Sequence, residues 1–233
     1  MQKRFFSTEF FIILLFFVMP PIIFPQTTGD EYVMEIPYTV FILAALSFCL
    51  WWQIKAEKNI QTPSQTSRLR VLMNHGHCLV TFGTLLVTAG GIELICRLSP
   101  VTQNKPHLLP PETFSGWLNV IFGTLCAAFY EEVLYRVYLP DAMKRIFVHR
   151  KGGSSFQSEV PQTTKKDLRS FALESAAVIL FALAHRYVGW ISVLNALIAG
   201  TVLRRCYIKT ASLLSCFIAH TLYNFVMLLA TLA

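Results

Sequence analysis

Two adjacent carboxylates, Glu131 and Glu132, lie within an apolar stretch of the chain, and Arg136 follows four residues after the second. An ionised side chain at the centre of a membrane helix costs roughly 2.5 kcal/mol or more, so such a residue indicates a functional site. Residues four apart share one face of a helix, which predicts an ion pair between Glu132 and Arg136. Glu131 is turned about 100° away from that pair and is left to face the protein interior.

Three more polar side chains lie in later apolar stretches and complete a set suited to hydrolysis. His185 ends one stretch, and His220 precedes Asn224 by four residues in another. Together with the carboxylates they supply a base, an orienting imidazole and donors for an oxyanion, the groups that water-mediated acyl hydrolysis requires. Each alone has a simpler interpretation, because buried ion pairs and membrane histidines also serve as interhelical contacts. Their combination on three helices favours a catalytic site.

The composition indicates a membrane protein. Of 233 residues, 54% are hydrophobic and 14% are charged, whereas soluble domains carry about 25% charged residues. The net charge of +7 comes from basic residues clustered between apolar stretches, as in the cytoplasmic loops of membrane proteins. No nucleic-acid partner is expected, because the sequence shows no basic face with stacking aromatic residues. The six cysteines lie singly, without a CxxC motif, so no disulfide framework is predicted.

The apolar stretches predict an all-α polytopic membrane protein with about seven transmembrane helices (six to eight), since a bilayer core requires about 20 apolar residues per helix. Pro20 and Pro21, rather than a small-residue cleavage site, follow the first stretch, which predicts a retained signal-anchor helix. The basic segments then fall on one side, so we expect an integral protein of the bacterial cytoplasmic membrane with its N-terminus in the cytoplasm. The expected helices cover residues 9–24, 36–52, 71–95, 114 to beyond 139, 171–187, 190–203 and 212–232.

The active site is expected between the fourth, fifth and seventh of these helices. Glu131 and His185 would differ by about 15 Å in depth if the fourth helix ended early, at a rise of 1.5 Å per residue. They meet only if the fourth helix continues to about Phe147 and the fifth begins near Leu168. Pro140 must then kink the fourth helix rather than end it.

Three motifs, in order and each on an expected membrane helix, carry a family resemblance. They are Glu131-Glu132-x-x-x-Arg136, Phe181-x-x-x-His185 and His220-x-x-x-Asn224, with the spacers Asn195-Ala196-x-x-x-Gly200 and Ser212-Leu213. This part of the chain, about residues 114–225, resembles the CPBP family, the CAAX proteases and bacteriocin-processing enzymes also called Abi. The resemblance implies N-terminal membrane helices without a specific motif at 1–113. It implies a catalytic membrane core at 114–233. Within that core, the polar composition at about 149–167, rich in glycine and serine, predicts a cytoplasmic loop.

The resemblance also implies an activity, that of an intramembrane endopeptidase of the glutamic type, similar to the enzymes of CAAX prenyl-protein processing. Its partners would be a membrane-associated protein or peptide substrate and the lipid bilayer. Glu131 would be the general base and would hold a water together with His185. His220 and Asn224 would donate hydrogen bonds to the tetrahedral oxyanion. No cofactor is implied.

The same resemblance implies supporting roles for three residues around the reacting groups. Glu132 and Arg136 would shape the site and balance its charge. Phe181 would pack beneath His185.

Two alternatives remain open. The first is a zinc metalloprotease in which Glu131, His185 and His220 bind the metal, since three protein ligands plus water form a catalytic zinc site. The sequence lacks the HExxH motif of many zinc proteases, and Asn224 would have no role in such a site. The second is a proton-coupled transporter that uses the glutamates and histidines as a relay. Such proteins usually contain internal repeats and broken helices, and neither is evident in this sequence.

Overall fold

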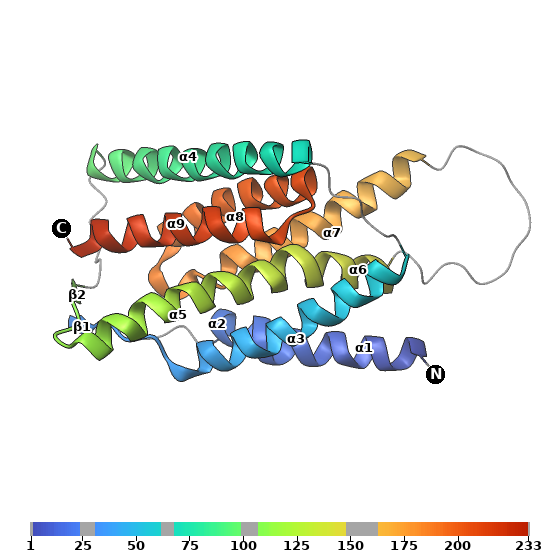
Figure 1. The fold of residues 1–233 in the computed structure, drawn as a ribbon, viewed down its shortest axis with the longest axis horizontal. Coiled ribbons are helices and arrows are strands. Elements are labelled where there is room, and N and C mark those ends of the chain that lie inside the picture. The colour runs from blue at the N-terminus through green and yellow to red at the C-terminus, as the bar shows by residue number, and fades with distance from the viewer. Residues whose placement is uncertain (1, 24–30, 62–67, 99–106, 148–162, 233) are drawn as a thin grey trace, which may run out of the picture.

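The computed structural model describes residues 2–23, 31–61, 68–98, 107–147 and 163–232, most of them in helices that run roughly along one long axis (Figure 1). Segments η1 and η2 are π-helical and η4 is a 3₁₀ turn. Two short strands, β1 (Glu31–Val33) and β2 (His107–Leu109), pair in parallel. The helical segments are α1 (Gln2–Ile13), η1 (Leu14–Val18), α2 (Met19–Ile23), α3 (Tyr38–Gln61), α4 (Arg68–Leu98), α5 (Phe114–Glu132), η2 (Val133–Tyr138), α6 (Leu139–Phe147), α7 (Thr163–Leu183), η4 (Arg186–Val188), α8 (Trp190–Thr210) and α9 (Leu213–Leu232).

Six helices in the described part of the chain are long and apolar enough to cross a membrane, and the apolar helix at Thr8–Ile23 is shorter. Their outer faces carry large apolar side chains, such as Leu79, Val87 and Leu98, that are at least 67% exposed. Soluble proteins rarely expose large contiguous apolar surfaces, whereas lipid covers such faces. The chain is therefore an all-α polytopic membrane protein, as predicted. The six spans are Tyr38–Ala56, His75–Leu98, Phe114–Phe147, Leu168–Val188, Trp190–Thr210 and Leu213–Thr231.

The helix that carries the two glutamates runs without interruption from Phe114 to Phe147 through α5, η2 and α6, with Glu131 near its middle (Figure 1). It is the most enclosed span, with 39% of its apolar window buried against 11% for Tyr38–Ala56. Thr113 caps its start by accepting a 3.1 Å hydrogen bond from the backbone N–H of Gly116. Pro140 does not end the helix, which instead contains a π-helical segment just before it. The predicted continuation to Phe147 is confirmed.

Several boundaries differ from the prediction because charged residues lie on helices rather than in loops. The sixth expected helix, placed at 190–203, continues as α8 to Thr210. The prediction treated Arg204 as a loop charge, but its side chain is buried among other helices. Lys144, also assigned to a loop, lies on α6. Residues 148–162, most of the predicted polar loop, lie outside the described residues, and α7 already begins at Thr163.

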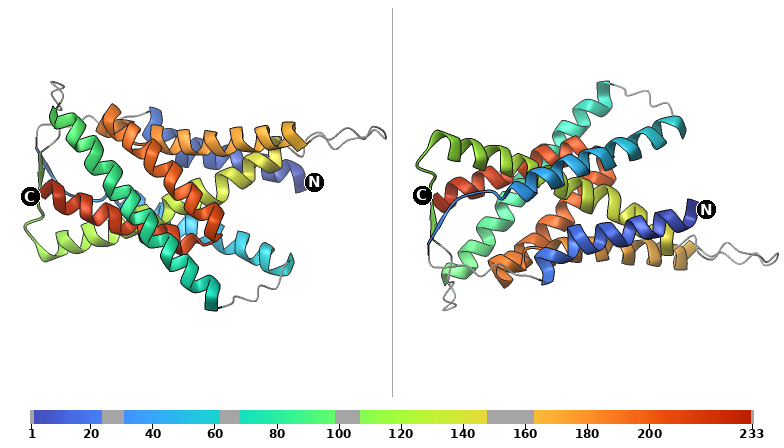
Figure 2. Two further views of the ribbon diagram at one scale, coloured as in Figure 1. Left: turned by 90° about the horizontal axis from the view of Figure 1, so that it is seen from above. Right: turned by 90° about the horizontal axis from the view of Figure 1, so that it is seen from below.

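Figures 1 and 2 show the two ends of the bundle, and the sequence places different charged residues near them. The strand pair and the end of α9 lie at one end, where Glu35 and Glu112 occur next to the strands in sequence. The start of α1, the ends of α3 and α6, and the turn between α8 and α9 lie at the other. Basic residues in the final turns of these helices or shortly before them lie toward this second end. They are Lys55, Lys144, Arg145, Arg205 and Lys209.

The N-terminal helices pack against the helix that carries the glutamates. Phe10 and Ile13 of α1 and Val18 of η1 are buried in one apolar cluster with Leu134 and Tyr135 of η2. Within a membrane, close packing of such side chains, rather than their removal from water, stabilises the association of helices. The first helices therefore form part of the wall behind the glutamates, although their sequence carries no motif.

Candidate active site

Glu132 and Arg136 form an ion pair in the centre of the bundle, and both side chains are fully buried. Nε of Arg136 lies 3.4 Å from Oε2 of Glu132, so the pair expected from their spacing is present. The guanidinium carbon of Arg136 also lies 4.4 Å from the ring centroid of Phe181 on α7, a cation–π contact. A buried charge is costly unless it is paired. These contacts compensate the charges of both side chains.

His220 on α9 lies between the two glutamates of α5. Its Nδ1 is 2.8 Å from Oε1 of Glu132, and its Nε2 is 3.7 Å from Oε2 of Glu131. An ionised carboxylate can only accept, so Nδ1–H donates to Glu132. The 3.7 Å separation from Glu131 is too long for a direct hydrogen bond. One imidazole therefore faces both carboxylates and binds one of them directly.

Phe181 connects the remaining aromatic groups of the site. Its ring centroid lies 4.8 Å from that of His185 and 6.2 Å from that of His220. Nδ1 of His185 lies 2.9 Å from the backbone carbonyl oxygen of Phe181 and donates to it, which leaves Nε2 as the acceptor nitrogen of the neutral ring. Phe181 thus lies against His185, as the family resemblance implies. Among the described residues, the imidazole near Glu131 is that of His220, at 3.7 Å, rather than that of His185.

Asn224 lies one helical turn after His220 on α9, is half-buried, and makes no hydrogen bond with any other described side chain. The preceding residue, Tyr223, accepts a 2.7 Å hydrogen bond from Nδ2 of Asn195 on α8. Asn195 therefore ties α8 to α9 beside the site, and its role follows from packing rather than from its place in a sequence motif.

A comparison with protein families assigns this region. Residues 113–226 match the family model of the type II CAAX prenyl endopeptidase, Rce1-like. This segment, just under half of the chain, therefore belongs to the Rce1-like family. Rce1-like proteins are CAAX endopeptidases, so this chain is a hydrolase that acts on peptide bonds, and the proton-coupled transporter is set aside. No curated protein and no solved structure matches the chain.

The Rce1-like segment contains every predicted site residue, but the structure does not gather them as a metal site. In the described parts of the chain, no group of three or more His, Cys, Asp and Glu side chains is arranged to hold a metal ion. The zinc alternative requires Glu131, His185 and His220 at one point, with ligand distances of about 2.0–2.2 Å. In this structure, His220 contacts the glutamates while His185 contacts Phe181.

Sequence reasoning missed two residues of the Rce1-like core that contact its central helix. Nη1 of Arg204 on α8 donates a 2.6 Å hydrogen bond to the backbone carbonyl of Arg136, and its Nη2 lies 3.4 Å from Oε1 of Glu174 on α7. Glu174 falls inside the fifth predicted span, where an ionisable side chain requires a partner. The need of Glu174 for a partner within the membrane was the signal that Arg204, assigned to a loop, lies inside the bundle.

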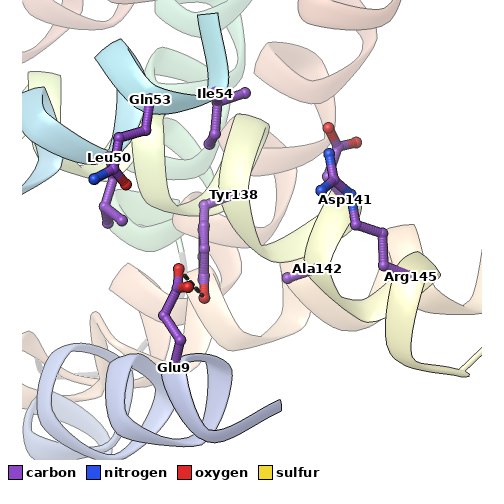
Figure 3. A pocket seen from close by; sticks show the side chains of 8 residues that line it. All are labelled: Glu9, Leu50, Gln53, Ile54, Tyr138, Asp141, Ala142 and Arg145. Atoms are coloured by element: carbon purple, nitrogen blue, oxygen red, sulfur yellow. Dashed lines mark hydrogen bonds between the residues drawn. The ribbon is translucent and has the colours of Figure 1, made fainter. Parts of the chain in front are cut away.

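A separate cavity of about 80 Å³ lies among α1, α3 and the η2–α6 segment (Figure 3). The hydroxyl of Tyr138 donates a 3.4 Å hydrogen bond to Oε1 of Glu9 across it. None of the predicted site residues lines this cavity, so it lies outside the candidate active site. The lining residues are Glu9, Leu50, Gln53, Ile54, Tyr138, Asp141, Ala142 and Arg145.

Proposed function

We propose that this Rce1-like protein hydrolyses its peptide bond by a glutamate-activated water, with Glu131 as the general base. The observation that carries the proposal is that His220 lies between two carboxylates and that one of them has more contacts than the other. Both oxygens of Glu132 have partners, Oε1 in His220 and Oε2 in Arg136. Within the described part of the chain, the one ion-pair contact of Glu131 is that with His220 at 3.7 Å. The contacts of Glu132 are therefore structural, whereas the carboxylate of Glu131 is available to bind a water.

The exposure of the two glutamates supports the same division. The side chain of Glu131 is 15% exposed and that of Glu132 is 0% exposed. A general base must reach the water whose proton it removes. Glu131 meets this condition and Glu132 does not.

The proposed reaction begins when Glu131 takes a proton from water and the water oxygen attacks the carbonyl carbon of the scissile bond. The carbonyl oxygen becomes an oxyanion, and preorganised donors stabilise its charge. His220 and Asn224, one turn apart on α9, are the proposed donors, with His220 donating from Nε2 in its doubly protonated form. The intermediate collapses as the carbon–nitrogen bond breaks, and Glu131 returns the proton to the leaving amine. His185 orients the water through its Nε2.

The proposed substrate is a membrane-associated protein or peptide that ends in a prenylated CAAX sequence, by extension from the family description. The purified protein in liposomes should cleave a prenylated CAAX peptide, and mass spectrometry of the products locates the cleaved bond. An unprenylated peptide of the same sequence is the matched control and should be cleaved poorly. Equal cleavage of both peptides would contradict the prenyl requirement, and cleavage of neither would contradict the proposed substrate.

The absence of a metal requirement is also a prediction. Nδ1 of His220 is hydrogen-bonded to Glu132, and no step of the proposed reaction uses a metal ion. Dialysis against a strong chelator should leave the cleavage rate unchanged. A loss of cleavage that zinc restores would favour the metalloprotease instead.

We further propose that the basic end of the bundle faces the cytoplasm, together with the start of α1. Lys144, Arg145 and Lys209 lie at this end, and basic residues concentrate on the cytoplasmic side of membrane proteins. An epitope tag placed before α1 should be protected from protease in intact cells and cleaved after permeabilisation. Cleavage in intact cells would reverse the orientation.

A further inference from the structure

Pro140 removes a hydrogen bond from the helix that carries the glutamates. In an α-helix, the N–H of residue 140 would donate to the carbonyl of residue 136, but proline has no N–H, and its ring crowds that carbonyl. The π-helical segment Val133–Tyr138 ends two residues before Pro140. The carbonyl of Arg136, the residue that pairs with Glu132, therefore cannot receive the α-helical hydrogen bond from residue 140.

Arg204 replaces the missing donor. Its Nη1 lies 2.6 Å from the carbonyl oxygen of Arg136, and its side chain is 10% exposed. A charge-assisted hydrogen bond of this kind is stronger than a neutral one. The contact comes from α8, 68 residues further along the chain.

Glu174 balances the charge of the Arg204 guanidinium and is separate from the Glu132–Arg136 ion pair. Its Oε1 lies 3.4 Å from Nη2 of Arg204 and also pairs with Nζ of Lys144 on α6. Two arginines thus lie close together, each with its own carboxylate: Arg136 with Glu132 and Arg204 with Glu174. The planar fork of an arginine can hold two acceptors in fixed directions, whereas a lysine cannot.

We propose that Arg204 is a positioning residue, which fixes the backbone of Arg136 and thereby the direction of the guanidinium that pairs with Glu132. The chain of contacts runs from Lys144 through Glu174 and Arg204 to the π-helical segment. The effect on cleavage rests on the proposed function, but the effect on the backbone of the helix does not.

The test compares Arg204→Lys with Arg205→Ala in the full-length protein in detergent. Arg205 is the exposed neighbour on α8 and serves as the control. Arg204→Lys retains the charge beside Glu174 but should lower kcat by roughly 10- to 100-fold, with little change in KM, because small misplacements of site groups have effects of this size. Arg205→Ala should leave both constants unchanged. Wild-type kcat in Arg204→Lys would overturn the proposal.

Pro140→Ala supplies a specific rescue. It restores an N–H that can donate to the carbonyl of Arg136, so Arg204→Lys should lower kcat by less than about threefold in that background, a non-additivity expected only for coupled residues. An ion pair that stabilised the bundle alone would give the same loss in both backgrounds. Equal losses would therefore overturn the proposal.

Hydrogen exchange separates this proposal from the substrate assignment. Arg204→Lys should accelerate amide exchange in residues 133–139, because the turn loses a hydrogen bond, and Arg205→Ala should not. This measurement needs no substrate, so it decides the role of Arg204 even if the wild-type protein cleaves no CAAX peptide. Unchanged exchange in Arg204→Lys would overturn the proposal.

Discussion

His220 and Glu132, on helices α9 and α5, are joined by a 2.8 Å hydrogen bond in a fully enclosed part of the bundle. The bond fixes the position of α9 relative to the catalytic helix. It also occupies one oxygen of Glu132 while Arg136 lies beside the other. The neighbouring Glu131 lies 3.7 Å from Nε2 of His220, so the two adjacent glutamates differ in their contacts.

Replacing Glu132 with alanine should destabilise the protein strongly, because Arg136 would remain buried without a counter-charge. The loss of one partner from a buried pair costs about 3–5 kcal/mol. Glu93→Ala is the control, since the pair of Glu93 with Arg97 is exposed and such pairs contribute about 0–1 kcal/mol. Unfolding in detergent, followed by circular dichroism, compares the two variants. Equal stabilities would contradict the role assigned to Glu132.

Replacing either histidine with alanine should abolish activity, but the two variants should differ in stability. His220→Ala leaves Oε1 of Glu132 buried without its donor, which should cost about 1–3 kcal/mol. His185→Ala removes a hydrogen-bond donor from the backbone carbonyl of Phe181 and a contact with its ring near the end of α7, and it leaves no buried carboxylate without a donor, so its effect on unfolding should be smaller. Cleavage assays and thermal unfolding of both variants check this order. A larger destabilisation by His185→Ala would refute it.

Asn224→Ala should lower kcat by about 10²–10³-fold if its amide stabilises the oxyanion, with little change in KM or in unfolding. Asn119 provides a matched control on α5. Its Oδ1 accepts a 2.8 Å hydrogen bond from the N–H of Ile36, and its Nδ2 donates to the carbonyl of the same residue at 3.3 Å. Asn119→Ala should therefore lower stability and leave the kcat of the folded protein unchanged. The opposite pattern would remove Asn224 from the site.

Gly200 should tolerate no side chain, because a Cβ there would lie 2.9 Å from Cδ1 of Phe181 and 3.2 Å from Cγ1 of Val178. Gly200→Ala would push the ring that lies against His185, and overpacking of this kind costs about 1–3 kcal/mol. Cleavage should fall as well. Gly91→Ala on α4 is the control, since its Cβ would meet nothing within 4 Å. Equal unfolding temperatures for the two variants would contradict this account of Phe181.

Contacts within one helix could be predicted from the sequence, whereas contacts between helices could not. The spacing of Glu132 and Arg136 was enough to predict their ion pair, and the depth of Glu131 relative to His185 required the long fourth helix that the structure has. The double contact of His220 depends on how α9 packs against α5. No periodicity in the chain contains that information.

Arg204 illustrates why the remaining part of the site escaped prediction. Two consecutive arginines are typical of a cytoplasmic loop, yet one is exposed and the other is buried. The difference arises because Glu174 and the carbonyl of Arg136 are both within reach of Arg204. The need for a donor at Pro140 is visible in the sequence, but the donor itself comes from tertiary packing.

The most direct test of the account is the cleavage rate of Glu131→Gln, which keeps the size of the side chain and removes its basicity. General-base catalysis contributes about 10²–10⁴-fold, so the rate on the prenylated CAAX peptide in liposomes should fall by at least about 10²-fold, with the unfolding temperature retained. A cleavage rate equal to that of the wild-type protein would contradict the assignment of Glu131 as the base.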